Sequence, residues 1–277
     1  MQTLSPAQLA RYREDGVVHV PGAVEREWVA RLTAVAQANL EHPSTWVNDS
    51  RGEGGAGRMF TDRYQWRENA EIRAYIFESG IAALMAQVLD SDQVRFYFDH
   101  LLIKEPNTDL TTPWHQDIPY WPFTGRQIGS AWLALTHTTV AHSGMEFIRG
   151  SHRNNVIYRP ELFGRQDADN PNADWTGLDG GEPVPDIEAD RGAHDIVSFD
   201  VAPGDLLLFS AWILHGARGN SSRKQRRIAF STRWLGDDAI WAPGPGTDPT
   251  VTAADVAVQP GQPPHDDTRF PQVWPTR

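Results

Sequence analysis

Hydrophobic residues in the first part of the chain recur every three or four positions, the spacing of helices that bury one face. Ser5 and Pro6 form a start signal for a first helix, and Gly16 stops it. The same spacing predicts two further helices, over residues 25–41 and 68–89. This part of the chain is therefore expected to be mainly helical.

From about residue 94 the pattern changes to short runs of aliphatic and aromatic residues, separated by turns that contain Gly or Pro. Many short strands with such turns are typical of a β-sandwich or barrel. The polar stretch 160–194 is too long for an ordinary connection and is interpreted as an insertion. The predicted strands cover residues 94–104, 128–136, 144–148, 196–201, 205–209 and 226–235.

These patterns predict one domain over residues 1–277. It would consist of a helical N-terminal part (1–92), a strand-rich core (93–236) and an irregular tail (237–277) that wraps the surface. Within the N-terminal part, VVHVPG is interpreted as a short strand, and the glycine-rich stretch 49–58 as a loop.

Composition narrows the range of partners. The chain carries 36 acidic and 25 basic residues, a formal net charge of −11, so its field repels nucleic acid and anionic membranes. A small molecule is the expected partner, and the protein is expected to be a monomer or homodimer.

There is no cysteine, which excludes disulfides and thiolate metal sites. The sequence shows no apolar leader and no run of roughly 20 apolar residues, so a cytoplasmic location is expected.

A candidate metal site lies in the segment WHQDIPYWPF. His115 and Asp117 are two residues apart, so on a strand both side chains would point the same way. A third ligand must come from a neighbouring strand, and His215, expected where an apolar strand meets a turn, is the candidate. Two histidines and one carboxylate leave three metal positions free, as in Fe(II) oxygenases. Zinc accepts the same ligands, so they alone leave the metal open.

The predicted strand RRIAFSTRW offers a second functional group. A 2-oxo diacid bound to iron needs a cation for its far carboxylate, and the planar fork of arginine suits that task. Because successive side chains of a strand point to opposite faces, Arg226 would share a face with Ile228 and Phe230, and Arg227 would lie on the other face. Because the bulkier apolar face is expected to line the interior, Arg226 should point inward and Arg227 into solvent. The alternative is that both are surface charges that balance an acidic protein.

Together these motifs resemble the phytanoyl-CoA dioxygenase family, a branch of the Fe(II)/2-oxoglutarate oxygenases. The resemblance covers residues 5–235 and is specific for the family rather than for a substrate. It implies a mainly β fold with flanking helices, a double-stranded β-helix (jelly roll, cupin-like). The segments that carry it are WHQDIPYWPF, LLIKEP, LHGARGNSSRKQRRIAFSTRW and GMEFIRGSHR, where Arg149 replaces the usual Pro.

The resemblance also implies roles for individual residues, with Fe(II), 2-oxoglutarate and O2 as cofactors. The iron ligands would be His115, Asp117 and His215, and Arg226, eleven residues after His215, would anchor 2-oxoglutarate. Ala217 stands where some relatives carry a Ser that contacts the cosubstrate, and His100 where relatives often carry Gln or Met. The other implied cosubstrate contacts are Trp132, Gln116, Lys104, His100 and Arg63.

The expected function is hydroxylation of an unactivated C–H bond in a small-molecule metabolite, with release of succinate and CO2. One alternative is a cupin-like metalloenzyme that does not use 2-oxoglutarate, which leaves Arg226 without a role. Another is a non-catalytic jelly-roll binding protein, which a full set of ligands disfavours. Turnover of 2-oxoglutarate to succinate with Fe(II) and ascorbate separates these alternatives.

Overall fold

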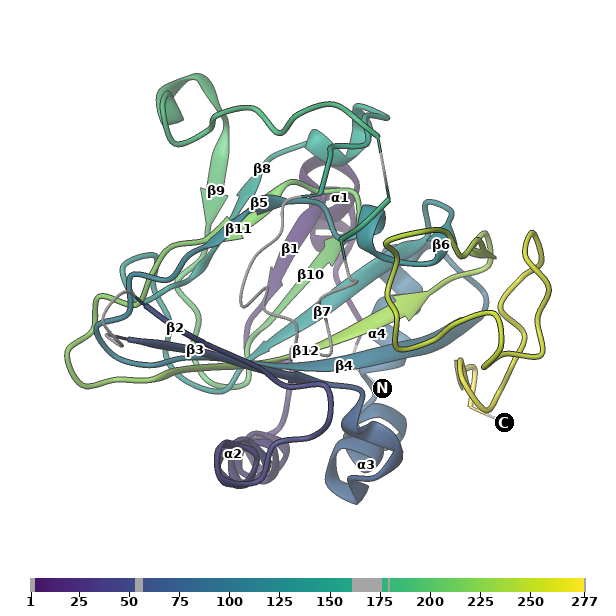
Figure 1. Cartoon of the computed structure of the whole chain (residues 1–277), viewed down its shortest axis with the longest axis horizontal. Helices are drawn as coiled ribbons and strands as arrows, with labels where there is room; N and C mark the ends of the chain where they lie inside the picture. Colours follow the sequence, from purple (N-terminus) through teal and green to yellow (C-terminus); the bar gives the residue numbers. More distant parts are fainter. Residues whose placement is uncertain (1–2, 53–56, 161–175, 179, 277) are drawn as a thin grey trace.

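Two antiparallel β-sheets face each other, and helices cover the outside of the larger one (Figure 1). The computed structural model describes residues 3–52, 57–160, 176–178 and 180–276. Within these residues the two sheets remain separate and do not close into one barrel. This mainly β arrangement confirms the jelly-roll fold class expected from the sequence.

The larger sheet runs in the order β1-β10-β7-β12-β4-β3-β2, with β14 also paired to β4. Its strands are β1 (Val17–Val20), β2 (Asn48–Arg51), β3 (Arg58–Arg63), β4 (Val94–Lys104), β7 (Ile128–Ala134), β10 (Leu206–Ser210), β12 (Arg227–Leu235) and β14 (Gln272–Trp274). The smaller sheet runs β5-β11-β8-β9, with β5 (Thr112–His115), β8 (Met145–Ile148), β9 (Ile196–Ser198) and β11 (His215–Ala217). A short pair joins β6 (Phe123–Thr124) to β13 (Ile240–Trp241).

The helices follow the predicted signals, with one break. They are α1 (Pro6–Asp15), α2 (Arg26–Glu41), α3 (Ala70–Glu78) and α4 (Ile81–Leu89), with short 3-10 turns η2 (Gln65–Arg67), η3 (Ile118–Tyr120), η4 (Ser151–Arg153) and η5 (Arg191–Ala193). The single helix expected over 68–89 is two helices, bent by 51° at a break that contains Gly80 (φ 81°). In the described part of the chain, no single helix is long and apolar enough to cross a membrane; α3 and α4 meet that length only as this bent pair.

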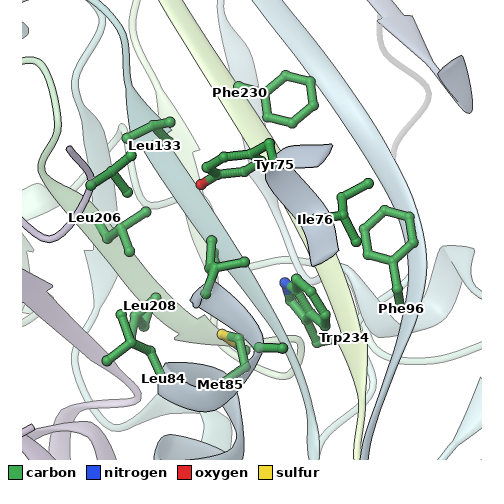
Figure 2. Close-up of a cluster of buried hydrophobic side chains, with 14 of the residues drawn as sticks. Tyr75, Ile76, Leu84, Met85, Phe96, Leu133, Leu206, Leu208, Phe230 and Trp234 are labelled. Carbon is green, nitrogen blue, oxygen red and sulfur yellow. The ribbon is translucent and has the colours of Figure 1, made fainter. Parts of the chain in front are cut away.

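The main hydrophobic core lies between the helices and the outer face of the larger sheet (Figure 2). Tyr75 of α3 packs edge-on against Phe230 of β12, with ring centroids 5.8 Å apart. Trp234, further along β12, packs in the same way against Phe96 of β4. The bulky apolar face of β12 is therefore the outer face, beneath the helices. The expectation that it lines the jelly-roll interior is wrong.

The two ends of the chain take part in the fold more than their patterns indicated. The N-terminal part supplies β1, β2 and β3 to the larger sheet. The tail supplies β13 and β14, and it buries Val251 and Phe270 in a second aromatic core with Tyr97 of β4. Residues 161–175 and 179 of the expected insertion lie outside the described residues, as does the middle of the loop expected over 49–58.

Candidate metal centre

His115, Asp117 and His215 converge between the two sheets, all buried, with one ligand atom from each lying within 4.8 Å of the others. His115 ends β5, and His215 begins β11 directly opposite it in the smaller sheet. Asp117 is not on the strand as expected; it has helical backbone angles and opens η3. The turn after β5, rather than strand alternation, brings this carboxylate beside the two imidazoles.

Both imidazoles are held in the form that a metal requires. Nδ1 of His115 lies 2.8 Å from the carbonyl oxygen of Pro113, and Nδ1 of His215 lies 3.0 Å from that of Ile213. A carbonyl only accepts, so each Nδ1 carries the proton and each Nε2 carries the lone pair with which an imidazole binds a metal. These Nε2 atoms lie 3.7 and 3.8 Å from Oδ1 of Asp117. Burial, together with the nearby His115, lowers the pKa of His215 to about 3, so its ring is neutral.

The carboxylate of Asp117 is kept ionised in this buried place. Burial alone would raise the pKa of Asp117, but the neighbouring His115, His215 and Arg233 hold it below its ordinary value. The hydroxyl of Ser130 on β7 donates to Oδ2 at 3.0 Å, which leaves Oδ1 facing the two histidines. Two neutral imidazoles and one anionic oxygen are a ligand set for a divalent cation.

The two arginines at the start of β12, Arg226 just before it and Arg227 as its first residue, are placed opposite to the expectation. Arg226 is partly exposed, and its guanidinium pairs with Glu105 at 2.8 Å. Arg227 is only 4 % exposed and lies opposite Lys104 of β4, on the interior face. Its Nη1 donates to the carbonyl of Leu102 at 3.2 Å, and its Nη2 to Ser143 at 3.3 Å. The reason is the face assignment: the interior side of β12 carries Arg227, Ala229, Ser231 and Arg233.

A family model for phytanoyl-CoA dioxygenase (PhyH) matches residues 12–228, a span that contains the whole triad. The chain belongs to the phytanoyl-CoA dioxygenase family. This confirms the resemblance seen in the sequence motifs. It accounts for the pairing of a jelly roll with two histidines and an aspartate at one end of the smaller sheet.

Solved structures of similar fold include alpha ketoglutarate dependent enzymes. The epimerase SnoN of nogalamycin biosynthesis, in complex with Fe3+, alpha ketoglutarate (2-oxoglutarate) and nogalamycin RO, is 25 % identical, with a TM-score of 0.72 over 96 % of this chain and 97 % of its own. The carbocyclase SnoK of the same biosynthesis is 22 % identical, with a TM-score of 0.74 over 98 % and 96 %. EctD from S. alaskensis, solved with 2-oxoglutarate and 5-hydroxyectoine, is 18 % identical, with a TM-score of 0.68 over 94 % and 85 %.

In this phytanoyl-CoA dioxygenase family member, four of the other expected site residues lie on the interior face of the larger sheet. Trp132 of β7 and His100 of β4 flank Ser231, and Arg63 of β3 lies opposite His100. Lys104 is fully buried and donates to the carbonyls of Ala217 and Arg218. Burial and the charge of Arg227 lower the pKa of Lys104 well below the ordinary value of a lysine.

Gln116 is not brought to the triad. Its amide nitrogen donates to the carbonyls of Val156 and Trp212, and its amide oxygen accepts from the backbone of Tyr158. These hydrogen bonds occupy the polar atoms of the Gln116 side chain and hold the backbone segments of Val156, Tyr158 and Trp212 next to it. The structure therefore gives Gln116 a place in the wall around the metal strand rather than beside a ligand.

The sequence interpretation missed four groups that face the interior: Ser130, Arg227, Ser231 and Arg233. A signal was available in the alternation along β12. The series Arg227, Ala229, Ser231, Arg233 combines small residues with cations, which suits a surface that receives a ligand, whereas the Ile228 and Phe230 side suits helix packing.

Proposed function

We propose that this protein is a non-haem Fe(II) enzyme that uses 2-oxoglutarate to hydroxylate a C–H bond of a small molecule. The observation that carries the proposal is a row of buried donors on the interior face of β7 and β12, the face that also carries Ser130, the hydrogen-bond partner of Asp117. Trp132 Nε1, Arg227 Nε and Ser231 Oγ have no hydrogen-bond partner among the residues that the structure describes. Buried donors are nearly always satisfied, so such a row points to a ligand that only accepts hydrogen bonds. A dicarboxylate with a keto group is such a ligand.

The residues present fit both the metal and the cosubstrate. His115, Asp117 and His215 would hold the metal through two Nε2 atoms and Oδ1, and three positions remain for other ligands. When bound, iron and 2-oxoglutarate supply the activation of O2 and the oxidation of the C–H bond, with succinate and CO2 as products. The protein contributes binding, orientation and exclusion of water.

Arg227 and Lys104 would hold the far carboxylate of 2-oxoglutarate. The two side chains face each other on neighbouring strands, and within the described chain their hydrogen bonds go to backbone carbonyls and the Ser143 hydroxyl rather than to a carboxylate. Two cations without an anion destabilise a buried site. A carboxylate bound between them restores balance, and the guanidinium fork can receive it through two parallel hydrogen bonds.

The test is formation of succinate from 2-oxoglutarate by the Fe(II)-loaded protein. We expect wild type to form succinate in air, and His115→Ala and His215→Ala to lose Fe(II) binding while their circular dichroism spectra stay unchanged. Normal succinate formation by either variant contradicts the metal assignment. Retention of Fe(II) without any binding of 2-oxoglutarate supports the alternative of a metalloenzyme that does not use the diacid.

A second outcome at the same centre is epimerisation of the oxidised carbon. It is supported by the similarity to SnoN, which extends over 96 % of this chain at 25 % identity. The two reactions differ in the fate of oxygen, because hydroxylation places one atom of O2 in the product and epimerisation does not. Once a substrate is found, mass spectrometry after reaction under 18O2 distinguishes them: a gain of one labelled oxygen supports hydroxylation.

A further inference from the structure

We propose that the molecule oxidised at this centre carries a carboxylate, and that Arg233 binds it. This inference rests on the proposed function, because it names the class of substrate that the same site receives. Arg233 lies on the interior face of β12, directly opposite Ser130 of β7. Ser130 in turn donates to the metal-ligating Asp117 at 3.0 Å, so this arginine lies beside the metal centre.

The guanidinium of Arg233 is buried without an adequate counter-charge. The residue is 7 % exposed, and neither its Nε nor its Nη1 has a hydrogen-bond partner within the described ranges. Burial lowers its pKa from the ordinary value, opposed by the charges of Asp117 and Asp99. Unpaired buried cations are costly, and they persist where an anion is received.

The two nearby carboxyl groups are committed elsewhere. Asp117 is a metal ligand in the proposed function and accepts from Ser130. Asp99 receives the backbone N–H groups of Gln65 and Trp66, and burial raises its pKa to about 7. Arg233 is therefore left with about one positive charge to match, which fits a monoanionic carboxylate better than a phosphate dianion.

Arg233 is also too far along the strand to share the carboxylate that Arg227 receives. The two residues are six positions apart on the same face of β12. At about 3.3 Å per residue, their Cα atoms are separated by roughly 20 Å. Arg227 lies opposite Lys104, whereas Arg233 lies opposite Ser130, which donates to Asp117 of the triad. The two arginines therefore serve different ligands.

The surroundings of Arg233 indicate what the rest of this substrate is like. A bulge in β4 gives that strand one extra residue opposite Arg233, so Tyr97 and Phe98 both join the buried aromatic cluster. The guanidinium lies 5.0 Å from the ring centroid of Phe98, which stacks on Tyr64 with centroids 4.9 Å apart. Tyr120 lies edge-on to His115 at 6.0 Å. An apolar body with a single carboxylate matches these neighbours.

The test uses the complete protein loaded with Fe(II) and 2-oxoglutarate without oxygen, so that both of those sites are filled and no turnover occurs. A panel of aliphatic and aromatic monocarboxylates, each paired with its neutral primary amide, is titrated by calorimetry. We expect wild type to bind the best carboxylate about 10- to 100-fold more tightly than its amide, as a charge-assisted contact implies. Arg233→Gln should remove that preference. Arg226→Gln, which removes the same charge from a partly exposed ion pair, should keep it.

The outcomes separate this inference from the proposed function. The visible absorption of the Fe(II)·2-oxoglutarate complex, recorded on the same samples, reports whether the centre is loaded. A wild-type protein that never forms this complex refutes the proposed function. A loaded wild type that binds carboxylates and amides equally, or binds neither, refutes the inference alone. Loss of 2-oxoglutarate binding in Arg233→Gln would instead assign this arginine to the cosubstrate and also refute it.

Stability gives a second, independent measurement. If Arg233 is held ready for a ligand, its charge does not stabilise the folded protein. The free energy of unfolding of Arg233→Gln, measured with urea in the absence of ligands, should then equal or exceed that of wild type. A structural partner of Asp117 or Asp99 would behave oppositely, because its removal leaves a buried carboxylate unpaired. A marked loss of stability in Arg233→Gln therefore contradicts the inference.

Discussion

At the residue scale, the neighbouring arginines Arg226 and Arg227 show how one step along a strand separates a surface charge from a site. Arg226 is partly exposed beside Glu105, and Arg227 is buried opposite Lys104. Both carry the same charge and differ by one position, so they form a matched pair for mutation.

We predict that Arg227→Met raises the KM for 2-oxoglutarate while Arg226→Met does not. Methionine keeps the apolar stem and removes the charge. A lost charge-assisted contact to the carboxylate is worth about 2–3 kcal/mol, so KM should rise roughly 30- to 150-fold with little change in kcat. Steady-state succinate formation measures both constants. An equal effect of the two substitutions would refute the assignment of the anchor to Arg227.

Asp99 gives a prediction on pH. Burial raises the pKa of Asp99 from 3.8 to about 7 in the folded protein. A carboxyl group that keeps its proton more readily when folded stabilises the protein fully below pH 3.8, and this contribution is lost as the pH rises through about 7. The free energy of unfolding should therefore decline as the pH rises from 5 to 8, and Asp99→Asn should remove this part of the decline. Urea unfolding over that pH range measures it.

Asp205 provides a control of opposite sign. Despite partial burial, hydrogen bonds from the backbone of Ala202 and Gly22 and from His19 lower the pKa of Asp205. Its contribution is present above the ordinary pKa of an aspartate and lost as the pH falls through the lowered value, so Asp205→Asn should leave the decline between pH 5 and pH 8 in place. If Asp99→Asn also leaves that decline unchanged, another group causes it.

At the scale of elements, the C-terminal tail packs against the second aromatic core, which contains Tyr97 and Tyr120. Asp248 is 2 % exposed, and its Oδ2 accepts from the hydroxyl of Tyr97 at 2.8 Å and from that of Tyr64. Its backbone N–H donates to the carbonyl of Tyr120 at 2.9 Å. One residue thus joins the tail to β4 and to the residue after β3 through its carboxylate, and to η3 through its backbone.

We predict that Asp248→Leu lowers the free energy of unfolding by about 1–3 kcal/mol, because it leaves buried phenol groups without their acceptor. Adding Tyr97→Phe to this variant should recover part of the loss, since it removes one of those groups. Urea unfolding of the single and double variants measures both effects. If Tyr97→Phe destabilises Asp248→Leu as much as it destabilises the wild type, the two side chains are not coupled.

At the scale of the whole molecule, the centre joins the two sheets. His115 and His215 come from the smaller sheet, and Arg227, Trp132 and Ser130 from the larger one. A metal and a diacid that bridge these sheets bind only the folded state, so they stabilise the whole domain.

We predict that 2-oxoglutarate, added at about 100 times its dissociation constant to the Mn(II)-loaded protein, raises the free energy of unfolding by a further ~2.7 kcal/mol. For a domain of this size, that corresponds to an increase in Tm of roughly 5–10 °C. His215→Ala should show almost none of this increase in the same thermal scan. An equal increase in the variant would place the stabilising ligand away from the triad.

Much of the fold was open to prediction from local pattern. The capping signals at Ser5 and Gly16 and the strand-forming run at 94–104 are confirmed as α1 and β4. These features depend on neighbours in the chain, whose preferences act before any packing. The break at Gly80 was missed because an apolar run on both sides of a glycine also fits one continuous helix.

The sequence by itself determined the fold class, the family and the three residues that converge as the candidate metal site, because ligand types and their spacing are written along the chain. It did not determine which face of β12 looks inward. Ile228 and Phe230 could pack in any apolar core. It is the packing of α3 and α4 against the outer face of the larger sheet that places these two side chains on that face. Strand alternation then turns Arg227 and Arg233 toward the interior. A one-residue step reverses every side chain of a strand, so the orientation of these cations is a property of the tertiary structure.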